Sequence, residues 1–323
     1  MCAARGRFAR AAPGVLLRWL SAGAVWMFKN LNPWALGIAG HQSEIIELAL
    51  THGFTSMDLD VASFASRVRL RGMAFARRLI DSARIRIGSF ALPFSIEADE
   101  EEFQRAVAKL PEYAQVAADV GCTRCVTLLA PASDKRPYHE NFEFHRKRLG
   151  EICAALQPAG VNLGIGFQAA EYLRKGQPFQ FIHDLEALTL LISMVAAPNL
   201  GMLIDTWELT AAGGAVDTIS KLSAGQVVAV RVANMPADVP LPDLGDTCRL
   251  LPDAENGRID VVAMLSALAA LGYAGPVTPW PSRSVFSTKR REAIVRQSAE
   301  SLDKVWRAAG LPVERRFATF ARL

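Results

Sequence analysis

The sequence predicts a single α/β domain of the (β/α)8 barrel class, and three observations lead to this prediction. Short apolar and β-branched runs alternate with longer amphipathic segments from about residue 34 onward. Several of the helical segments end at turn signals such as Gly53, Gly121 and Gly272. The length of 323 residues suits eight such units in one domain.

The expected strands are the short apolar runs, at 34–39, 55–60, 85–91, 123–130, 161–167, 200–205, 227–233 and 276–280. The expected helices lie between them, at 42–52, 64–81, 98–119, 140–157, 180–196, 214–222 and 259–271, with a last one at 288–308. A doubly wound open sheet is the alternative. Such a sheet usually carries a glycine-rich phosphate loop after its first strand, and the segment GIAGHQSE lacks that pattern.

Residues 1–26 are treated as an N-terminal extension, and the barrel is placed at 27–323. The extension has a basic start, an apolar stretch and small residues, so it faintly resembles a signal or transit peptide. Arg18 interrupts its apolar run, which is too short to span a bilayer. We therefore expect a disordered extension, or a segment upstream of a true start at Met27, and no membrane partner.

The composition favours a small-molecule partner. The net charge is +4, and charges of both signs are mixed along the chain, without a basic stripe that would indicate nucleic-acid binding. Five cysteines are spread along the chain, and the CxxC of Cys122 and Cys125 has no second pair. We interpret these two cysteines as structural, because zinc or redox use needs a fuller set of partners. Reduced thiols predict a cytoplasmic protein.

The fold prediction directs attention to the residues that follow the strands. In (β/α)8 barrels the active site lies at the carboxyl ends of the strands and in the loops beyond them. Asp205 ends an apolar strand there, and a buried carboxylate is costly unless it is paired or hydrogen-bonded. The polar residues expected at this end of the barrel are His41, Gln42, Asp58, Asp60, Gln168, Glu171, Asp205, Glu208, Arg231, Asn234 and Arg249.

Three stretches of the chain resemble a known family. They are SEIIELALTHGFTSMDLD, LGMLIDTWEL and RLLPDAENGRIDVVAMLSALAALGYAGPVTP. Together with the alternation of strands and helices from about Leu36 to Leu311, they are similar to the xylose isomerase-like TIM barrels, the sugar phosphate isomerase/epimerase group. The resemblance implies a TIM barrel and an activity of the isomerase class.

The resemblance also implies a divalent-metal site, and this chain departs from it. Members of the family generally hold the cation with a Glu on strand five, an Asp on strand six, a His on strand seven and a Glu on strand eight. By position, only the Asp remains, as Asp205. The other three positions fall on Gly166, on Arg231 and on or beside Trp280, and the His that usually follows the strand-six aromatic is Glu208. We therefore expect no metal and no other cofactor, since a divalent cation needs several oxygen or imidazole ligands.

An arginine can supply the positive charge that the cation would provide. A guanidinium binds a carboxylate through two parallel hydrogen bonds, so we expect Arg231 to pair with Asp205. Asp205 and Glu208 are then the candidate acid/base groups, and Arg231 and Arg249 are the candidate holders of an oxyanion or phosphate. The candidate substrate-binding residues are Arg249, His41, Gln168, Asn234, Trp207 and Trp280.

The sequence thus predicts a sugar or sugar-phosphate isomerase/epimerase-like protein that lacks the usual divalent-metal chemistry. The expected partner is a carbohydrate or sugar-phosphate ligand. The alternative is a non-catalytic relative that binds a sugar-like ligand, a phosphorylated ligand or a protein through the same end of the barrel. Metal-dependent repair nucleases share the fold, but they need a cluster of histidines that this chain lacks.

Overall fold

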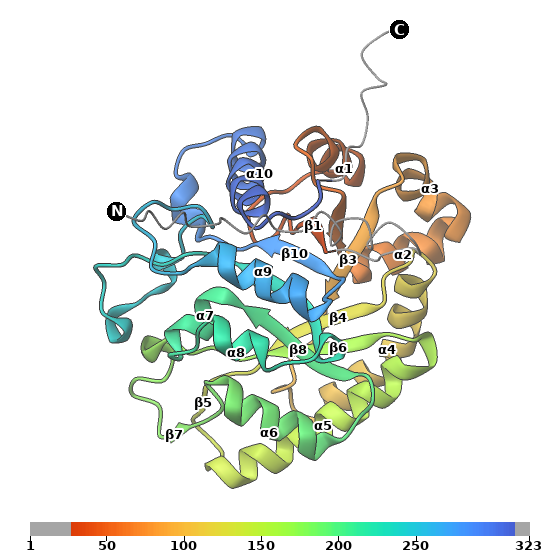
Figure 1. Ribbon diagram of the computed structural model, residues 1–323. Helices are drawn as coiled ribbons and strands as arrows, with labels where there is room; N and C mark the ends of the chain where they lie inside the picture. Colours follow the sequence, from red (N-terminus) through yellow and green to blue (C-terminus); the bar gives the residue numbers. More distant parts are fainter. Residues whose placement is uncertain (1–26, 314–323) are drawn as a thin grey trace, which may run out of the picture.

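The computed structural model describes residues 27–313, and these residues form one closed barrel. Its eight parallel strands follow the order β1-β10-β9-β8-β6-β4-β3-β2 around the barrel, with helices in the connections and on the outside (Figure 1). The predicted (β/α)8 TIM barrel is therefore confirmed. The N-terminal extension, residues 1–26, lies outside the described residues.

The predicted strands match the observed ones closely, except for the first. The barrel strands are β1 (Phe28–Leu31), β2 (Ser56–Leu59), β3 (Arg86–Ala91), β4 (Arg124–Leu128), β6 (Asn162–Gly166), β8 (Leu200–Asp205), β9 (Val227–Val232) and β10 (Pro276–Pro279). The prediction of a first strand at 34–39 is wrong, because this apolar run follows β1 as a turn. Asn32 accepts a hydrogen bond from the Ala35 amide there, and Gly37 has a φ of +68°.

The helices also follow the predicted pattern, with one split and one addition. They are α1 (Gln42–Thr51), α2 (Val61–Arg71), α3 (Met73–Ala83), α4 (Glu100–Ala118), α5 (Tyr138–Leu156), α6 (Leu185–Val195), α7 (Thr206–Ala211), α8 (Val216–Ser220), α9 (Val261–Leu271) and α10 (Arg291–Ala308). The helix predicted at 64–81 is two helices, which meet at Gly72 with a φ of +79°. Helix α7 was not predicted. A small antiparallel sheet, β5 (Ala132–Ser133) with β7 (Phe179–Gln180), joins two loops at the carboxyl ends of the strands.

The inside of the barrel has a polar half and an apolar half. The buried side chains of Asn30 on β1 and Thr278 on β10 are hydrogen-bonded to each other in the polar half. In the apolar half, Val126, Leu203 and Ala229 form a small buried cluster, separate from the main core between the sheet and the helices. At the carboxyl end of the strands, which we call the mouth of the barrel, β1 and β10 of the polar half lie across the barrel from β6 and β4.

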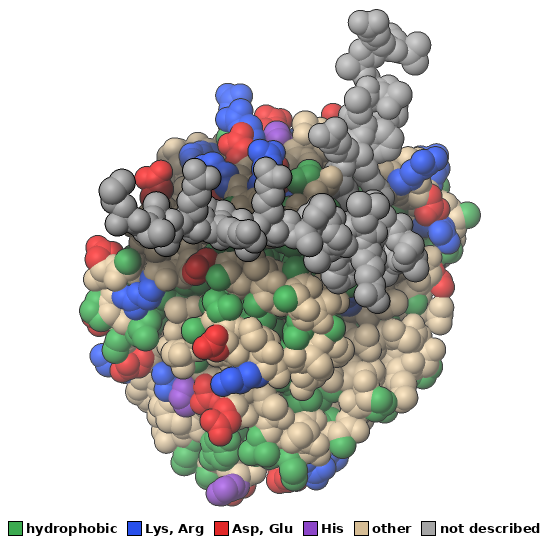
Figure 2. All heavy atoms as spheres, viewed as in Figure 1, with side chains coloured by type: hydrophobic (Ala, Val, Ile, Leu, Met, Phe, Trp, Pro, Cys, Tyr) green, Lys and Arg blue, Asp and Glu red, His purple; other side chains and the backbone are tan. Residues whose placement is uncertain are grey.

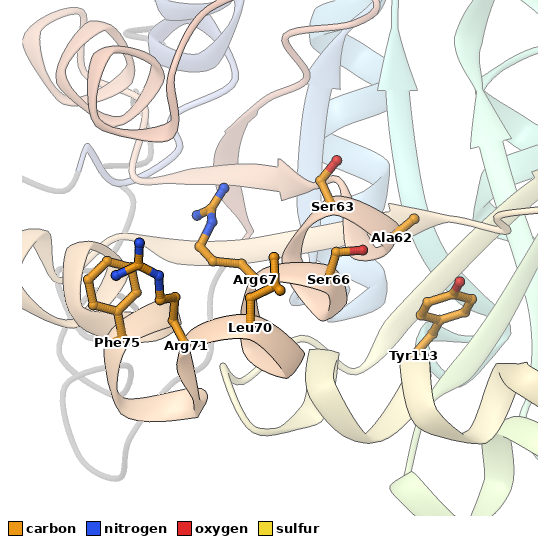
Figure 3. A pocket seen from close by; sticks show the side chains of 8 residues that line it. All are labelled: Ala62, Ser63, Ser66, Arg67, Leu70, Arg71, Phe75 and Tyr113. Atoms are coloured by element: carbon orange, nitrogen blue, oxygen red, sulfur yellow. The ribbon is translucent and has the colours of Figure 1, made fainter.

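The hollow described on the outer surface lies away from the mouth of the barrel. Acidic and basic side chains are interspersed on the face shown in Figure 2. A hollow of about 620 Å³ lies on the outer helices α2, α3 and α4 (Figure 3). Its lining residues are Ala62, Ser63, Ser66, Arg67, Leu70, Arg71, Phe75 and Tyr113, all from the helical layer rather than the strand ends. In the described part of the chain, no helix is both long and apolar enough to span a bilayer.

Candidate functional site at the barrel mouth

Arg249 joins two buried carboxylates at the end of β8. Its Nη1 atom donates to both carboxylate oxygens of Asp205, at 2.9 and 3.2 Å, and its Nη2 atom donates to Glu208. All three side chains are buried. The carboxylates therefore share one guanidinium, and the buried charges are compensated inside the protein.

The start of α7 holds the two carboxylates in place. Asp205 is the N-cap of α7, and its Oδ1 atom accepts hydrogen bonds from the amides of Trp207 and Glu208. The Oε2 atom of Glu208 accepts a hydrogen bond from the Ala169 amide at 2.7 Å. Every carboxylate oxygen of the pair thus has a donor, and neither group is presented to a ligand as a free acid or base.

The long connection after β9 brings Arg249 to this position. The backbone of Asn234 exchanges two hydrogen bonds with Leu250, at 2.8 and 3.0 Å, and the carbonyl of Arg249 accepts from the Ser282 amide at 2.8 Å. Trp207 is buried, its indole Nε1 atom donates to the carbonyl of Cys248, and its ring lies 4.6 Å from the Arg249 guanidinium. These contacts fix Arg249 from its backbone as well as from its side chain.

The pKa shifts in this cluster follow from burial and mutual charge. Burial alone would lower the pKa of Arg249, but the charges of Asp205 and Glu208 outweigh it and raise that pKa. For Glu208 the balance is reversed, because burial and the charge of Asp205 raise its pKa despite the nearby Arg249. Arg249 therefore stays charged, whereas burial and the charge of Asp205 disfavour the ionised form of Glu208.

The partner predicted for Asp205 must be corrected. Asp205 and Arg231 are neighbours in the register of β8 and β9, as expected. The hydrogen bonds of the Asp205 side chain nevertheless go to Arg249 and to the start of α7, while the Arg231 guanidinium lies over the ring of Trp280, 3.6 Å from its centroid. Stacking on the indole directs Arg231 away from Asp205.

Arg231 is a half-buried cation without an acceptor among the described residues. The guanidinium lies over the Trp280 ring, which does not serve its five N–H groups as an ordinary hydrogen-bond acceptor. Burial lowers the pKa of Arg231 to about 10, although the charges of Asp205 and Asp58 act in the opposite direction. The guanidinium thus remains charged near neutral pH, and an anion that reached it would find all its donors available.

Asp58 is a mouth residue for which the sequence indicated no role. It lies on β2 opposite a register shift in β3, where Met57 pairs with Ile87 but Leu59 pairs with Phe90. This bulge turns the amide of Ser89 toward the Asp58 side chain. The carboxylate accepts from the Ser89 amide and hydroxyl, at 2.9 and 2.8 Å.

The burial of Asp58 raises its pKa, and this effect exceeds the lowering by its hydrogen bonds and by the charge of Arg231. Asp58 is half-buried, and so are Arg231 and Trp280. Leu128, at the end of β4, is 37% exposed. The accessible part of the mouth therefore presents a carboxyl group, a stacked guanidinium and an apolar side chain.

Three other residues that were predicted to bind a ligand differ in how exposed their side chains are. The Asn234 side chain is buried, and its amide is hydrogen-bonded to the backbone of Met235, Pro252 and Ile259. His41 is exposed at the start of α1. Gln168 is half-buried just beyond β6. The Asn234 side chain thus holds the long connection after β9. A ligand-binding role for His41 and Gln168 remains a prediction.

The residues at the mouth do not fit the divalent cation that the family resemblance implies. A Cβ atom added at Gly166 would lie 2.8 Å from Leu128 Cδ2 and 3.3 Å from the Leu203 carbonyl oxygen, so the Leu128 side chain fills the space of a ligand there. Arg231 is a cation at a second ligand position, and both oxygens of Asp205 already accept hydrogen bonds from protein donors. Within residues 27–313, no group of three or more His, Cys, Asp or Glu side chains is placed to hold a metal ion.

Comparison with solved structures supports the fold. A xylose isomerase domain protein from Alicyclobacillus acidocaldarius is 24% identical, with a TM-score of 0.79 over 88% of this chain and 99% of that chain. The IOLI protein with a bound zinc atom is 18% identical, with a TM-score of 0.72 over 87% and 99% of the two chains. D-psicose 3-epimerase, solved with D-fructose, is 12% identical, with a TM-score of 0.66 over 88% and 100%.

Comparison with curated proteins gave no significant match. A family model described as the xylose isomerase-like TIM barrel matches residues 46–305, which is most of the chain and spans the strands from β2 to β10. The resemblance carried by the three sequence stretches is therefore confirmed. The chain belongs to the xylose isomerase-like TIM barrel family.

Proposed function

We propose that this chain binds a small sugar-derived anion at the barrel mouth and that it does so without a divalent cation. The observation that carries this proposal is Arg231, a half-buried guanidinium stacked on Trp280 that has no acceptor among residues 27–313. No nitrogen of Arg231 is both buried and unpaired, so its donors are open to solvent and can pair with an anionic ligand. A solved epimerase of similar fold, crystallised with D-fructose, supports a sugar-like ligand.

The geometry favours binding over the acid/base roles predicted for Asp205 and Glu208. Arg249 and backbone amides hold both carboxylates, so a proton transfer through either one would break the buried ion pair. The role of Arg231 as an anion holder, in contrast, needs no rearrangement. We therefore rank the non-catalytic alternative above isomerisation by Asp205 and Glu208.

A metal-free isomerase or epimerase is the second candidate function, and Asp58 favours it. This carboxyl group is half-buried at the mouth, its pKa is raised, and the charge of Arg231 acts on it. A carboxyl group with a raised pKa beside an anion holder is a suitable acid/base group for moving a proton next to a carbonyl.

The first prediction concerns metal. Because Gly166 and Arg231 replace ligands and Leu128 fills the space beside them, we expect the purified protein to hold no stoichiometric Mn, Mg, Zn or Co. A chelator should leave its melting temperature unchanged, since only a ligand that binds the folded state raises it. Elemental analysis and thermal melts with and without EDTA check this. A tightly bound divalent ion in stoichiometric amount would contradict the proposal.

The second prediction concerns Arg231. The Arg231→Leu variant should lose binding of anionic probes, D-gluconate and D-glucose 6-phosphate, in calorimetry, because it removes the mouth guanidinium that has no acceptor among residues 27–313. Its stability should change by less than about 1 kcal/mol, since only a contact with an indole ring is lost. The control is Arg71→Leu, which removes a guanidinium stacked on Phe75 on the outer helices. Equal anion binding by wild type and Arg231→Leu would show that the anion site lies elsewhere.

A further inference from the structure

We propose that Asp58 and Arg231 together recognise a hydroxy acid, that is, a ligand with a carboxylate for Arg231 and a hydroxyl group for Asp58. This inference rests on the proposed function and names the class of ligand that the same site takes. Four observations carry it: the hydrogen-bonding capacity of Asp58, the rigidity of its surroundings, the charge of the mouth and the apolar side chain beside it.

The two oxygens of Asp58 are unequally used. Oδ1 accepts three hydrogen bonds, from Asn30 Nδ2 at 2.8 Å, the Ser89 amide at 2.9 Å and the Ser89 hydroxyl at 2.8 Å. Oδ2 accepts one, from Asn32 Nδ2 at 2.8 Å. Because each carboxylate oxygen has about two acceptor sites, Oδ1 is saturated and Oδ2 can accept one more donor. The side chain is half-buried rather than enclosed, so that donor can come from a ligand.

The surroundings of Asp58 hold this oxygen in place. Asn30 is fully buried, and it also donates to Thr278 and accepts from the Ser56 hydroxyl. Asn32 is fixed on its other side by the Ala35 amide. Neither asparagine can therefore turn to leave Asp58 without breaking another hydrogen bond. A preorganised acceptor loses little conformational entropy when a ligand binds.

The charge of the mouth favours a carboxylate over a phosphate. The charges that act on Arg231 are those of Asp205, Asp58, Glu208 and Arg249. The mouth thus contains two guanidinium groups and three carboxyl groups, and Arg249 already forms ion pairs with Asp205 and Glu208. A phosphate dianion would meet more repulsion than attraction in this setting, whereas a single carboxylate matches the fork of one guanidinium.

The apolar side of the mouth suits the carbon chain of such a ligand. Leu128 is 37% exposed, and it lies against Gly166 on the wall opposite the polar half. A hydroxy acid has a carboxylate at one end, hydroxyl groups along one face and C–H groups along the other. Arg231, Asp58 and Leu128 offer a matching group for each of these parts.

The test uses three probes of equal chain length with the full-length protein. D-gluconate carries a carboxylate and hydroxyl groups, hexanoate carries only the carboxylate, and D-glucitol carries only hydroxyl groups. Calorimetry should show D-gluconate binding tighter than either of the others by about tenfold or more, the effect of one charge-assisted hydrogen bond. The shorter hydroxy acids D-glycerate and L-threonate are measured beside them, so that chain length does not decide the result.

Two variants assign the effect to Asp58. Asp58→Asn should reduce the preference for a hydroxy acid over hexanoate to within about twofold, because the amide replaces an acceptor by a donor. Asp60→Asn is the matched control, since Asp60 is an exposed cap of α2 near the same strand end. If Asp58→Asn does not fold, the comparison of probes on the wild-type protein still decides the question.

Three outcomes would overturn the inference in different ways. If D-glucose 6-phosphate binds through Arg231 and no hydroxy acid does, the ligand class is wrong but the proposed function stands. If hexanoate binds as tightly as the hydroxy acids, Asp58 accepts no hydrogen bond from a ligand hydroxyl group, and the inference is wrong. If none of these anions binds, both the inference and the proposed function fail.

Discussion

Replacing Arg249 by leucine should destabilise the protein by about 3–5 kcal/mol, because the change leaves two carboxylates buried without their cation. Ionised Asp205 and Glu208 only accept hydrogen bonds, so leucine, which has no donor, leaves the oxygens that faced Arg249 without that donor. Chemical denaturation at pH 7, followed by circular dichroism, measures this loss. Arg231→Leu is the matched control, since Arg231 has no acceptor among the described residues and its removal leaves no new unpaired charge.

The pH dependence of this loss has a definite sign. The pKa of Glu208 is already raised by burial in the wild-type protein, and removing Arg249 takes away a charge that lowers it. A carboxyl group whose pKa is raised in the folded state favours folding below its unfolded pKa, and this contribution is lost as the pH rises through the folded pKa. The destabilisation of Arg249→Leu should therefore be smaller at pH 5 than at pH 7.

Charge removal completes the thermodynamic cycle for this cluster. The combination of Arg249→Leu with Asp205→Asn and Glu208→Gln should recover part of the stability, because no buried charge then remains. A penalty for Arg249→Leu below about 1 kcal/mol, independent of pH, would mean that the ion pair is solvated and contributes as little as a surface pair.

The substitution Gly88→Ala should destabilise the protein by about 3–5 kcal/mol through overpacking and the loss of buried hydrogen bonds. A Cβ atom at Gly88 would lie 2.2 Å from Asn30 Oδ1 and 2.6 Å from Asn30 Cγ. Asn30 is fully buried and hydrogen-bonded to Asp58, Thr278 and Ser56, so it cannot move aside without leaving these groups unpaired.

Gly150→Ala is the control, and its effect should have the opposite sign. Gly150 lies inside α5, and a Cβ atom there meets no other atom within 4 Å. Alanine should stabilise the helix at this position by roughly 0.5–1 kcal/mol, since glycine loses more backbone entropy on folding. The two variants are compared by urea denaturation. A Gly88→Ala variant as stable as Gly150→Ala would show that the polar half of the barrel is loosely packed.

The fold could be predicted because most strands are short apolar runs with clear ends. Leu200–Asp205 is an example, since the apolar run stops at a carboxylate in both the sequence and the structure. The first strand was missed because Lys29 and Asn30 are polar, although Lys29 is buried against Asp303. Only the folded chain brings Asp303 to Lys29, so hydropathy alone directs attention to the more apolar turn that follows.

The candidate site could be located but not assembled from the sequence. Adjacent strand ends correctly placed Asp205 next to Arg231 in the sheet. The side chain that reaches Asp205 is nevertheless Arg249, from a loop whose course depends on hydrogen bonds to Asn234 and Ser282. Asp58 was expected at this end of the barrel but without a role, because its donors come from a bulge, from β1 and from the turn after β1. Loop paths and bulges leave no periodic signal in a sequence.

The attachment of the loop that carries Arg249 has a consequence for how fast a ligand can enter. This loop bonds to the end of β9, to the segment after β10 and, through Arg249, to β8 and α7. A segment tied at so many points opens only rarely, since its opening would cost nearly as much as disrupting the barrel itself. We therefore expect the association rate to be limited by diffusion and orientation rather than by the movement of this segment.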